Sequence, residues 1–397
     1  MWRRLPSIFL KCVCVCLSIG DFDSLTWYKW APVISAQTFR VLHSFSAPPD
    51  GEQPYAGLTI IGRNLFGTTE YGGTRGCGVV FKIDPFGVES ILHSFTCSPD
   101  GEYPFATLIS VDGNLYGTTA LGGKFSYGSV FKIDSQGLET VLHSFKSRGK
   151  DGQSPYAGLA RNSAGNFYVT TVEGGAFNAG VILEFGPTIG GEKILHNFEN
   201  GLDGANPISV LTLDSFGNLY GTAQRGGSTL CGFGCGTVFK VDIDGNFSVL
   251  HSFTGTPDGY DPAYEKLTID FAGNLFGTTA SGGAFNAGTI FKLDPQGNET
   301  ILYNFTGGAD GAGPMAGVVM DSAGNLYGTT FSGGSANAGT VFKLDTSGEE
   351  TILHSFTGIK DGENPYAGIV MDKVGNLYGA TPTGGAGGQG TVFKIIP

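Results

Sequence analysis

The chain of 397 residues has a formal net charge of −12, and only 15% of its residues are charged, while it contains 66 glycines and 30 phenylalanines. This composition predicts an all-β protein in which many short strands and tight turns surround an aromatic core. The acidic balance excludes a phosphate-binding surface of clustered Lys and Arg, so we expect no nucleic-acid partner.

The first 36 residues lie outside the repeated part of the chain. They open with Arg3 and Arg4, continue with an apolar segment from Leu5 to Ile19 that Lys11 interrupts, and end in Ile34-Ser35-Ala36. This order predicts a signal peptide, with residues 1–36 as leader. The apolar run is shorter than the roughly 18 residues of a membrane helix, so we expect no membrane span in the mature chain. A secreted, extracellular or cell-surface protein is the resulting prediction.

From Gln37 onward the chain repeats with a period of about fifty residues, which indicates a repeat architecture. Each unit contains four predicted strands, which we number from the first to the fourth. Examples are Tyr366–Met371, Asn325–Thr330, Gly339–Asp345 and Glu350–Phe356. Short Asp-x-x-Gly turns separate the first strand from the second and the third from the fourth, because Asp caps the turn and Gly accepts a positive φ.

Seven copies of each landmark are present. The Asp-Gly pairs start at Asp50, Asp100, Asp151, Asp203, Asp258, Asp310 and Asp361, and the double glycines start at Gly72, Gly122, Gly174, Gly226, Gly282, Gly333 and Gly384. The repeats begin with a lone fourth strand, Thr38–Phe45, and stop after a third strand, Gly390–Ile396. Four-stranded units are complete only if the first strand joins the last three. We therefore predict a seven-bladed β-propeller of residues 37–397, closed by the N-terminal strand.

This arrangement places the double-glycine loops and the Asp-Gly loops on one face, which we call the long-loop face. Cys77 and Cys97 lie in two successive loops of this face, and Cys231 and Cys235 lie close together in a third. An even cysteine count in a secreted chain predicts two disulfides. The alternative, a metal site at the CGFGC segment, lacks companion ligands, and we expect no metal.

All six histidines occupy one position of the fourth strand, and Tyr303 takes the seventh. They are His43, His93, His143, His196, His251 and His354. Catalytic or metal-binding roles would need them close together, whereas the repeat distributes them around the ring. We predict a structural role, in which each histidine forms a hydrogen bond within its blade, either to the Asp-Gly aspartate or to a threonine.

Function is expected where the repeat is broken on the long-loop face. The residue before each double glycine varies: Tyr71, Leu121, Glu173, Arg225, Ser281, Ser332 and Thr383. The fifth unit departs further, and its segment is expected to expose Tyr260, Asp261, Tyr264, Glu265 and Lys266. Aromatic and charged side chains on a loop rim favour ligand capture. The predicted ligand-binding residues are Tyr71, Glu173, Arg225, Tyr260, Asp261, Tyr264, Glu265 and Lys266.

No nucleophile elbow, phosphate loop or metal-ligand cluster is present in the sequence, so we predict no catalytic residue and no cofactor. The leading hypothesis is a monomeric, non-catalytic binding or scaffolding module for a glycan or an extracellular protein. The alternative is an extracellular hydrolase or lyase of polysaccharides that uses Glu173, Arg225 and Glu265.

Four linked motifs, GNLYGTT, GTVFKLD, ETVLHSF and DGxxPYAGL, recur along about nine-tenths of the chain. Together they resemble the GloVer tandem repeat. This resemblance implies a surface or extracellular bacterial protein with propeller-like repeats, and it brings no assigned activity, substrate or catalytic residue.

Overall fold

The structure, a computed structural model, describes residues 37–146, 151–187 and 191–397. Residues Gln37–Pro397 form one compact unit. The predicted signal peptide lies outside the described residues. Within the described ranges, no helix is long and apolar enough to cross a membrane.

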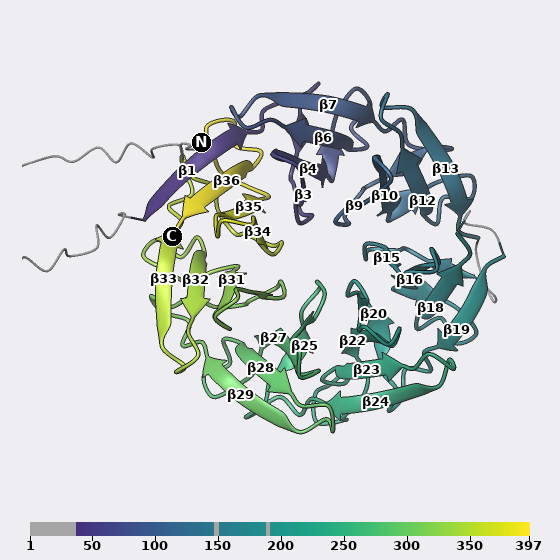
Figure 1. Cartoon of the computed structure of the whole chain (residues 1–397), viewed down its shortest axis with the longest axis vertical. Helices are drawn as coiled ribbons and strands as arrows, with labels where there is room; N and C mark the ends of the chain where they lie inside the picture. Colours follow the sequence, from purple (N-terminus) through teal and green to yellow (C-terminus); the bar gives the residue numbers. More distant parts are fainter. Residues whose placement is uncertain (1–36, 147–150, 188–190) are drawn as a thin grey trace, which may run out of the picture. The chain divides into compact units, whose positions relative to one another are not determined.

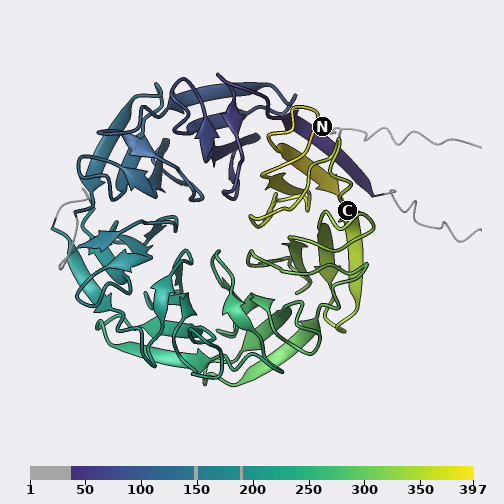
Figure 2. The same ribbon diagram turned by 180° about the vertical axis from the view of Figure 1, so that it is seen from behind.

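The unit is an all-β ring of seven sheets, a seven-bladed propeller, as the sequence predicts (Figures 1 and 2). The strands of each blade are given from the inner to the outer edge. Blade 1 contains β3 (Thr59–Ile61), β4 (Asn64–Thr69), β6 (Val79–Ile83) and β7 (Glu89–Ser94), and blade 2 contains β9 (Ile109–Val111), β10 (Asn114–Thr119), β12 (Ser129–Ile133) and β13 (Glu139–Ser144). Blade 3 contains β15 (Ala160–Arg161), β16 (Phe167–Thr171), β18 (Val181–Phe185) and β19 (Lys193–Asn197). Blade 4 contains β21 (Thr212–Leu213), β22 (Leu219–Arg225), β23 (Thr237–Val241) and β24 (Phe247–Ser252). Blade 5 contains β26 (Thr268–Ile269), β27 (Leu275–Ser281), β28 (Thr289–Leu293) and β29 (Glu299–Asn304). Blade 6 contains β30 (Val319–Met320), β31 (Leu326–Thr330), β32 (Thr340–Leu344) and β33 (Glu350–Ser355). Blade 7 contains β34 (Val370–Met371), β35 (Leu377–Thr381), β36 (Thr391–Ile396) and β1 (Thr38–Ser44).

Short strand pairs extend the blades on the long-loop face. They are β2 (Gly51–Glu52) with β5 (Tyr71–Gly72), β8 (Gly101–Glu102) with β11 (Leu121–Gly122), and β14 (Gly152–Gln153) with β17 (Glu173–Gly174). In blades 4 and 5 the equivalent segments, β20 (Ala205–Pro207) and β25 (Tyr260–Pro262), pair directly with the long second strands β22 and β27. These two sheets therefore contain a fifth short strand beside the four strands of the repeat.

The ring closes where the two ends of the propeller meet. Strand β1 pairs antiparallel with β36, from Thr38 opposite Ile396 to Ser44 opposite Thr391. The N-terminal strand is thus the outer strand of the last blade, and Figure 1 shows it beside the yellow strands of blade 7. The predicted closure is confirmed, and it removes the bare sheet edges that an open array would leave.

The sequence predicts the second, third and fourth strands to within one residue in the sixth unit, but it overestimates the first. In blade 7 the expected strand Tyr366–Met371 is reduced to Val370–Met371 in β34. Tyr366 and the two residues after it are not in a strand, and the chain bends at Ala367. This irregular segment leads each blade towards the ring axis.

Candidate ligand-binding site

A ring of large side chains surrounds the propeller axis near the long-loop face. Six blades contribute one residue each from the segment before the inner strand; they are Tyr55, Phe105, Tyr156, Ile208, Tyr264 and Tyr366. The turn that leads to this position has an unusual backbone. In blade 7, for example, Asn364 has φ 55° and its N–H donates to the Ala338 carbonyl of the preceding blade at 2.8 Å. This link between blades directs the following residues towards the axis.

The aromatic members of the ring contact one another. Tyr55 stacks on Phe105 with a centroid distance of 4.8 Å, and it meets Tyr366 edge-on at 5.2 Å. Phe105 contacts Tyr156 at 5.4 Å, and Tyr264 contacts Tyr366 at 5.2 Å. All five rings are half-buried. They therefore keep part of their surface available to a ligand.

The rings enclose a chamber of about 110 Å³ on the axis. We call it the aromatic chamber; its lining comprises Tyr55, Phe105, Tyr156, Tyr264 and Tyr366 together with Glu265, Thr107 and small or aliphatic residues. Its size is several times what one water needs and is comparable with cavities that admit a benzene-sized molecule. The chamber can hold one small chemical group.

Glu265 reaches this chamber because blade 5 breaks the repeat. In blade 7 a single residue, Gly368, lies between Ala367 and Ile369, whereas three residues lie between Ala263 and Leu267 in blade 5. Both alanines hold the same position, since each carbonyl accepts a hydrogen bond at 3.1 Å from a threonine hydroxyl of the preceding blade. Blade 5 thus has two more residues in this segment, which consists of Tyr264, Glu265 and Lys266. They project towards the axis.

The Glu265 carboxylate extends across the channel to blades that do not neighbour blade 5. It accepts hydrogen bonds from the Gly368 N–H and from the Thr107 hydroxyl. Its Oε1 lies where a Cβ on Gly57 would be only 2.7 Å away, so a glycine is needed there to admit it. Burial raises the pKa of Glu265, and the two hydrogen bonds and Lys266 oppose this shift. The side chain is half-buried, because it is surrounded by protein yet faces open chambers on both sides.

A second, wider chamber of about 800 Å³ begins on the other side of Glu265. The inner strands of the blades line it, with residues such as Ile60, Ile109 and Val370, and Lys266 and Arg161 contribute positive charge. Glu265 lines both chambers and thus forms part of the partition between them. The aromatic chamber opens on the long-loop face, and the wide chamber lies towards the short hairpins.

Polar side chains lie close to the aromatic rings where the chamber opens on the long-loop face, an opening that we call the mouth. Gln224 Nε2 donates to Tyr264 Oη at 2.9 Å. Its side chain also hydrogen-bonds to Asp261, whose Oδ1 is buried without a hydrogen-bond partner among the described residues. Burial raises the pKa of Asp261, and Gln224 and Arg225 oppose this shift. Asp261 Oδ1 is therefore a buried acceptor behind the aromatic rings.

Acidic side chains dominate the field at this mouth. Burial, followed by the charge of Glu70, raises the pKa of Tyr55, and burial together with Glu70 and Glu173 raises that of Tyr156. Burial and the neighbouring Glu70 also raise the pKa of Tyr71 to about 12. These shifts show that carboxylates act on the aromatic hydroxyls from several blades.

The predicted site residues fall into two groups. Tyr264 and Glu265 line the aromatic chamber, and Asp261 lies outside the lining with its charge acting on Tyr264. Tyr71 lies nearby and contacts Tyr103 edge-on at 5.1 Å. Lys266 is exposed beside Glu265 and lines only the wide chamber. Of the five blade 5 residues expected to be exposed, Lys266 alone is fully so.

The remaining predicted residues lie away from the chamber. Glu173 is exposed on β17, and its charge acts on Tyr156. Arg225 is exposed at the end of β22, with its guanidinium 5.5 Å from the ring centroid of Phe233. Tyr260 packs against the hydrophobic cluster that contains Cys231 and Cys235. Glu173, Arg225 and Glu265 are therefore not gathered in one cavity.

Sequence reasoning missed four aromatic residues of the chamber and two polar residues near it. They are Tyr55, Phe105, Tyr156 and Tyr366, and Glu70 and Gln224. Their signal is present in the motif PYAGL, whose aromatic position is occupied by Tyr or Phe in four of the seven units. We interpreted that residue as part of a buried strand, because alternation alone does not show that the segment bends towards the axis.

The histidines occupy the outer strands and contact the Asp-Gly aspartates. His354 Nε2 lies 3.0 Å from Asp361 Oδ2, and His196 lies 3.0 Å from Asp203. Tyr303 donates to Asp310 at 3.2 Å in the equivalent place. Burial lowers the pKa of His354, and Asp361 opposes this shift. The contact is one of the two that the sequence suggested, and the structural role of the histidines remains a prediction.

A glutamate from the next outer strand joins several of these pairs, which sequence reasoning missed. Three groups bring their ligand atoms within 4.8 Å: His43, Asp50 and Glu89; His143, Asp151 and Glu192; His251, Asp258 and Glu299. These residue types could hold a cation. Burial raises the pKa of Glu89 and Glu299 to about 7, so these carboxyls share protons with their neighbours near neutral pH.

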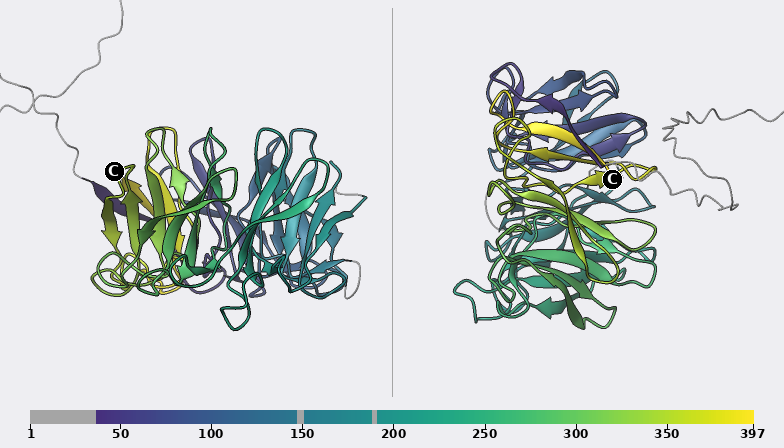
Figure 3. Two further views of the ribbon diagram at one scale, coloured as in Figure 1. Left: turned by 90° about the horizontal axis from the view of Figure 1, so that it is seen from below. Right: turned by 90° about the vertical axis from the view of Figure 1, so that its left-hand side faces the viewer.

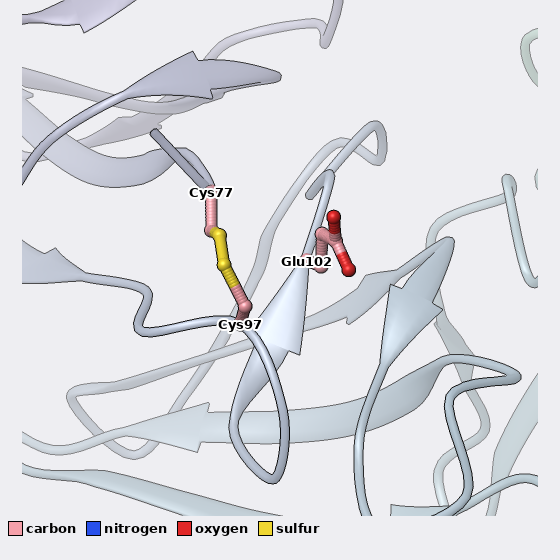
Figure 4. Close-up of side chains that lie close together, drawn as sticks. All are labelled: Cys77, Cys97 and Glu102. Atoms are coloured by element: carbon pink, nitrogen blue, oxygen red, sulfur yellow. A yellow bond between two sulfur atoms is a disulfide. The ribbon is translucent and has the colours of Figure 1, made fainter. Parts of the chain in front are cut away.

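Both predicted disulfides are present. Cys77 and Cys97 join two loops of the long-loop face with Cα atoms 5.5 Å apart, and Glu102 lies close to them (Figure 4). Cys231 and Cys235 close a loop of blade 4, with Cα atoms 5.1 Å apart. In the side view, a loop in the teal-green of blade 4 extends beyond the others (Figure 3). The bonded sulfurs are not available as thiolate ligands, which removes the metal alternative at the CGFGC segment.

The fold and this site define a propeller with an aromatic chamber on its axis. Residues 17–162, 135–322 and 307–397 match the family described as the Gloeobacter/Verrucomicrobia repeat. The chain belongs to this family. No curated protein matches it.

Of three similar solved structures, the first has a TM-score above 0.5 and supports the fold alone. The extracellular domain of BT3049 from B. thetaiotaomicron is 13% identical with a TM-score of 0.57, over 91% of this chain and 41% of that one. The chain thus spans about two-fifths of that protein's length. A nidogen/laminin complex is 17% identical with a TM-score of 0.46, over 73% of this chain and 92% of that chain. TolB from Acinetobacter baumannii is 14% identical with a TM-score of 0.45, over 72% and 61%.

Proposed function

We propose that the protein is a non-catalytic binding module that recognises a glycan outside the cell or at its surface through the mouth of the aromatic chamber. The observation that carries this proposal is the convergence of five aromatic rings from different blades on one axial chamber. Aromatic faces pack against the C–H surfaces of sugar rings, and Glu265 and Thr107 in the chamber lining supply polar groups for hydroxyls. The family, the propeller fold and the two disulfides agree with an extracellular module.

The experiment is a glycan array probed with the wild-type protein and with Tyr366→Ala. We expect binding by the wild type and a loss of about tenfold or more in the variant, because Tyr366 contacts three other rings of the mouth. Phe86→Ala is the control, since Phe86 is 90% exposed on a short hairpin away from the mouth. Thermal unfolding of both variants separates lost binding from lost folding.

The results also separate the competing functions. A silent array, with binding to an extracellular protein that Tyr366→Ala weakens, would replace the glycan with a protein partner. Turnover of a polysaccharide that Glu265→Gln abolishes would instead support the hydrolase or lyase. Binding that Tyr366→Ala leaves unchanged would contradict the proposed site.

A further inference from the structure

We infer that the aromatic chamber binds an alkylammonium group, either a protonated amine or a quaternary ammonium. The inference deepens the proposed function and rests on it, because it assigns the chemistry of the group that enters the chamber. It starts from the lining, in which the only ionisable carboxyl is Glu265 and the largest surfaces are the rings of Tyr55, Phe105, Tyr156, Tyr264 and Tyr366.

The rings supply the first part of the recognition. An aromatic face is electron-rich, and it attracts a cation that lies within about 6 Å of the ring centroid, most strongly where water is excluded. The rings lie 4.8 to 5.4 Å from their neighbours around the chamber. The rings thus pack against one another, and because all five line the chamber and are half-buried, a group in the chamber meets the ring surface that these contacts leave uncovered.

Glu265 supplies the second part. Hydroxyl and amide groups are sufficient to hydrogen-bond a neutral sugar ring. A carboxylate in a partly dry chamber instead favours a positively charged ligand. The Gly368 N–H and the Thr107 hydroxyl orient the Glu265 carboxylate at the end of the chamber. They leave further lone pairs for a ligand, because an ionised carboxylate offers about four acceptor sites.

The surroundings and the size agree with this assignment. Glu70, Glu173 and Asp261 act on the tyrosines of the mouth, and Arg225, the cation that opposes them, lies over Phe233. Lys266 acts on Glu265 but lines only the wide chamber on the far side. A volume of about 110 Å³ suits a compact cationic head group and excludes a whole oligosaccharide. The remainder of the ligand would lie on the long-loop face.

The test compares choline with 3,3-dimethyl-1-butanol, its uncharged analogue of equal shape, by calorimetric titration of the full chain at constant ionic strength. We expect choline to bind at least about tenfold more tightly than the alcohol. Equal affinities, or no binding of choline, would overturn the inference. This comparison uses the wild-type protein and does not depend on the folding of a variant.

Two variants locate the site. Glu265→Gln and Tyr366→Leu should each weaken choline binding by about tenfold. The first substitution removes the negative charge, and the second replaces an aromatic ring with an aliphatic side chain. Glu349→Gln is the matched control, because Glu349 is exposed on a short hairpin. Choline binding that both site variants leave unchanged would contradict the assignment.

Further probes identify the source of the ammonium group and separate this inference from the proposed function. A preference for glucosamine over glucose would indicate an amino sugar, and binding of Nα-acetyl-lysine amide would indicate a protein; either supports the ammonium site. Choline binding with a silent glycan array would retain the inference and remove the glycan function. Glycans bound without choline would retain the glycan function and remove the inference.

Discussion

The interior of each blade depends on a pair of residues that face each other across the two middle strands. In blade 6, Gly328 lies opposite Phe342, and a Cβ on this glycine would be 2.6 Å from the Phe342 ring. Five other blades repeat the pair. In blade 3, Val169 lies opposite Leu183, so a larger residue on one strand accompanies a smaller one on the other. The sum of the two volumes matters more than either residue alone.

This complementarity predicts the effects of exchanging the pair. Leu183→Phe should lower the free energy of unfolding by about 1–3 kcal/mol, because Val169 occupies the space that the ring needs. The double variant Val169→Gly with Leu183→Phe should recover part of that loss. Denaturant unfolding of the wild type, both single variants and the double variant gives the coupling energy. Additive effects would contradict the argument.

Single residues also show where sequence reasoning stops. The Asp-x-x-Gly-Asn turn was predictable in detail: Asp321 Oδ1 accepts from the N–H groups of Ala323 and Asn325 at 2.9 Å, and Gly324 has φ 89°. Glu265 was recognised as a departure from the repeat, but it was placed on an exposed loop. Its position in the channel depends on Gly57, Thr107 and Gly368, which lie far away in sequence and meet it only across the closed ring.

At the level of elements, the outer strands follow one another around the perimeter (Figure 1). Glutamates at the start of these strands meet the His–Asp or Tyr–Asp pair of the preceding blade. Burial raises the pKa of Glu139, Glu299 and Glu350 to about 7. For the aspartates the effect is opposite: burial would raise the pKa of Asp100 and Asp361, but hydrogen bonds from His93, Thr357 and their neighbours hold it below its usual range.

These opposite shifts predict the pH dependence of stability. Between about pH 4.5 and 7 the folded protein holds more protons on its glutamates than the unfolded chain does, so stability should fall as pH rises through this window. The aspartates, whose pKa is lowered, contribute stability above about pH 4 that is lost on further acidification. The glutamate contribution to the melting temperature should therefore be largest near pH 4.5 and decline towards pH 7, while His196 and His354, whose pKa burial lowers, act in the opposite direction below about pH 6.5.

Glu299→Gln and Glu350→Gln should each flatten the decrease above pH 5, because an amide cannot lose the proton. Glu349 is next to Glu350 but exposed, so Glu349→Gln should leave the decrease in melting temperature above pH 5 unchanged. A chelator provides a further control: a melting temperature that falls on adding EDTA would show that His251, Asp258 and Glu299 hold a cation rather than share protons. The sequence suggested the Asp-Gly aspartate or a threonine as the partner of each histidine, but the glutamate is a partner across a blade boundary and needed the packing of the ring to be found.

At the scale of the whole molecule, stability depends on closure. The incomplete units at the two ends of the repeat were enough to predict it, because strand counts do not require knowledge of packing. The axial site was not predictable in the same way. It is lined by segments of six blades that approach one another only after the ring has closed, and alternation of residue types does not reveal an irregular segment that bends towards the axis.

The strand β1 is the element on which closure depends. It covers the edge of β36, and Phe45 at its end is fully buried in a cluster that contains Phe81 of blade 1 and Val392 of blade 7. Deletion of Gln37–Phe45 should therefore remove a side chain shared by two blades and leave a bare strand edge in blade 7.

We expect this deletion to abolish the cooperative unfolding transition measured by circular dichroism, and to produce larger species in size-exclusion chromatography as exposed β36 edges pair between molecules. A chain that begins at Gln37 is the matched control and should unfold cooperatively, since residues 37–397 form the compact unit. An unchanged single transition and an unchanged elution volume after the deletion would show that blades 1 to 6 are stable without the ring. In that case the axial chamber, which takes residues from blades on both sides of the closure, should still lose its ligand.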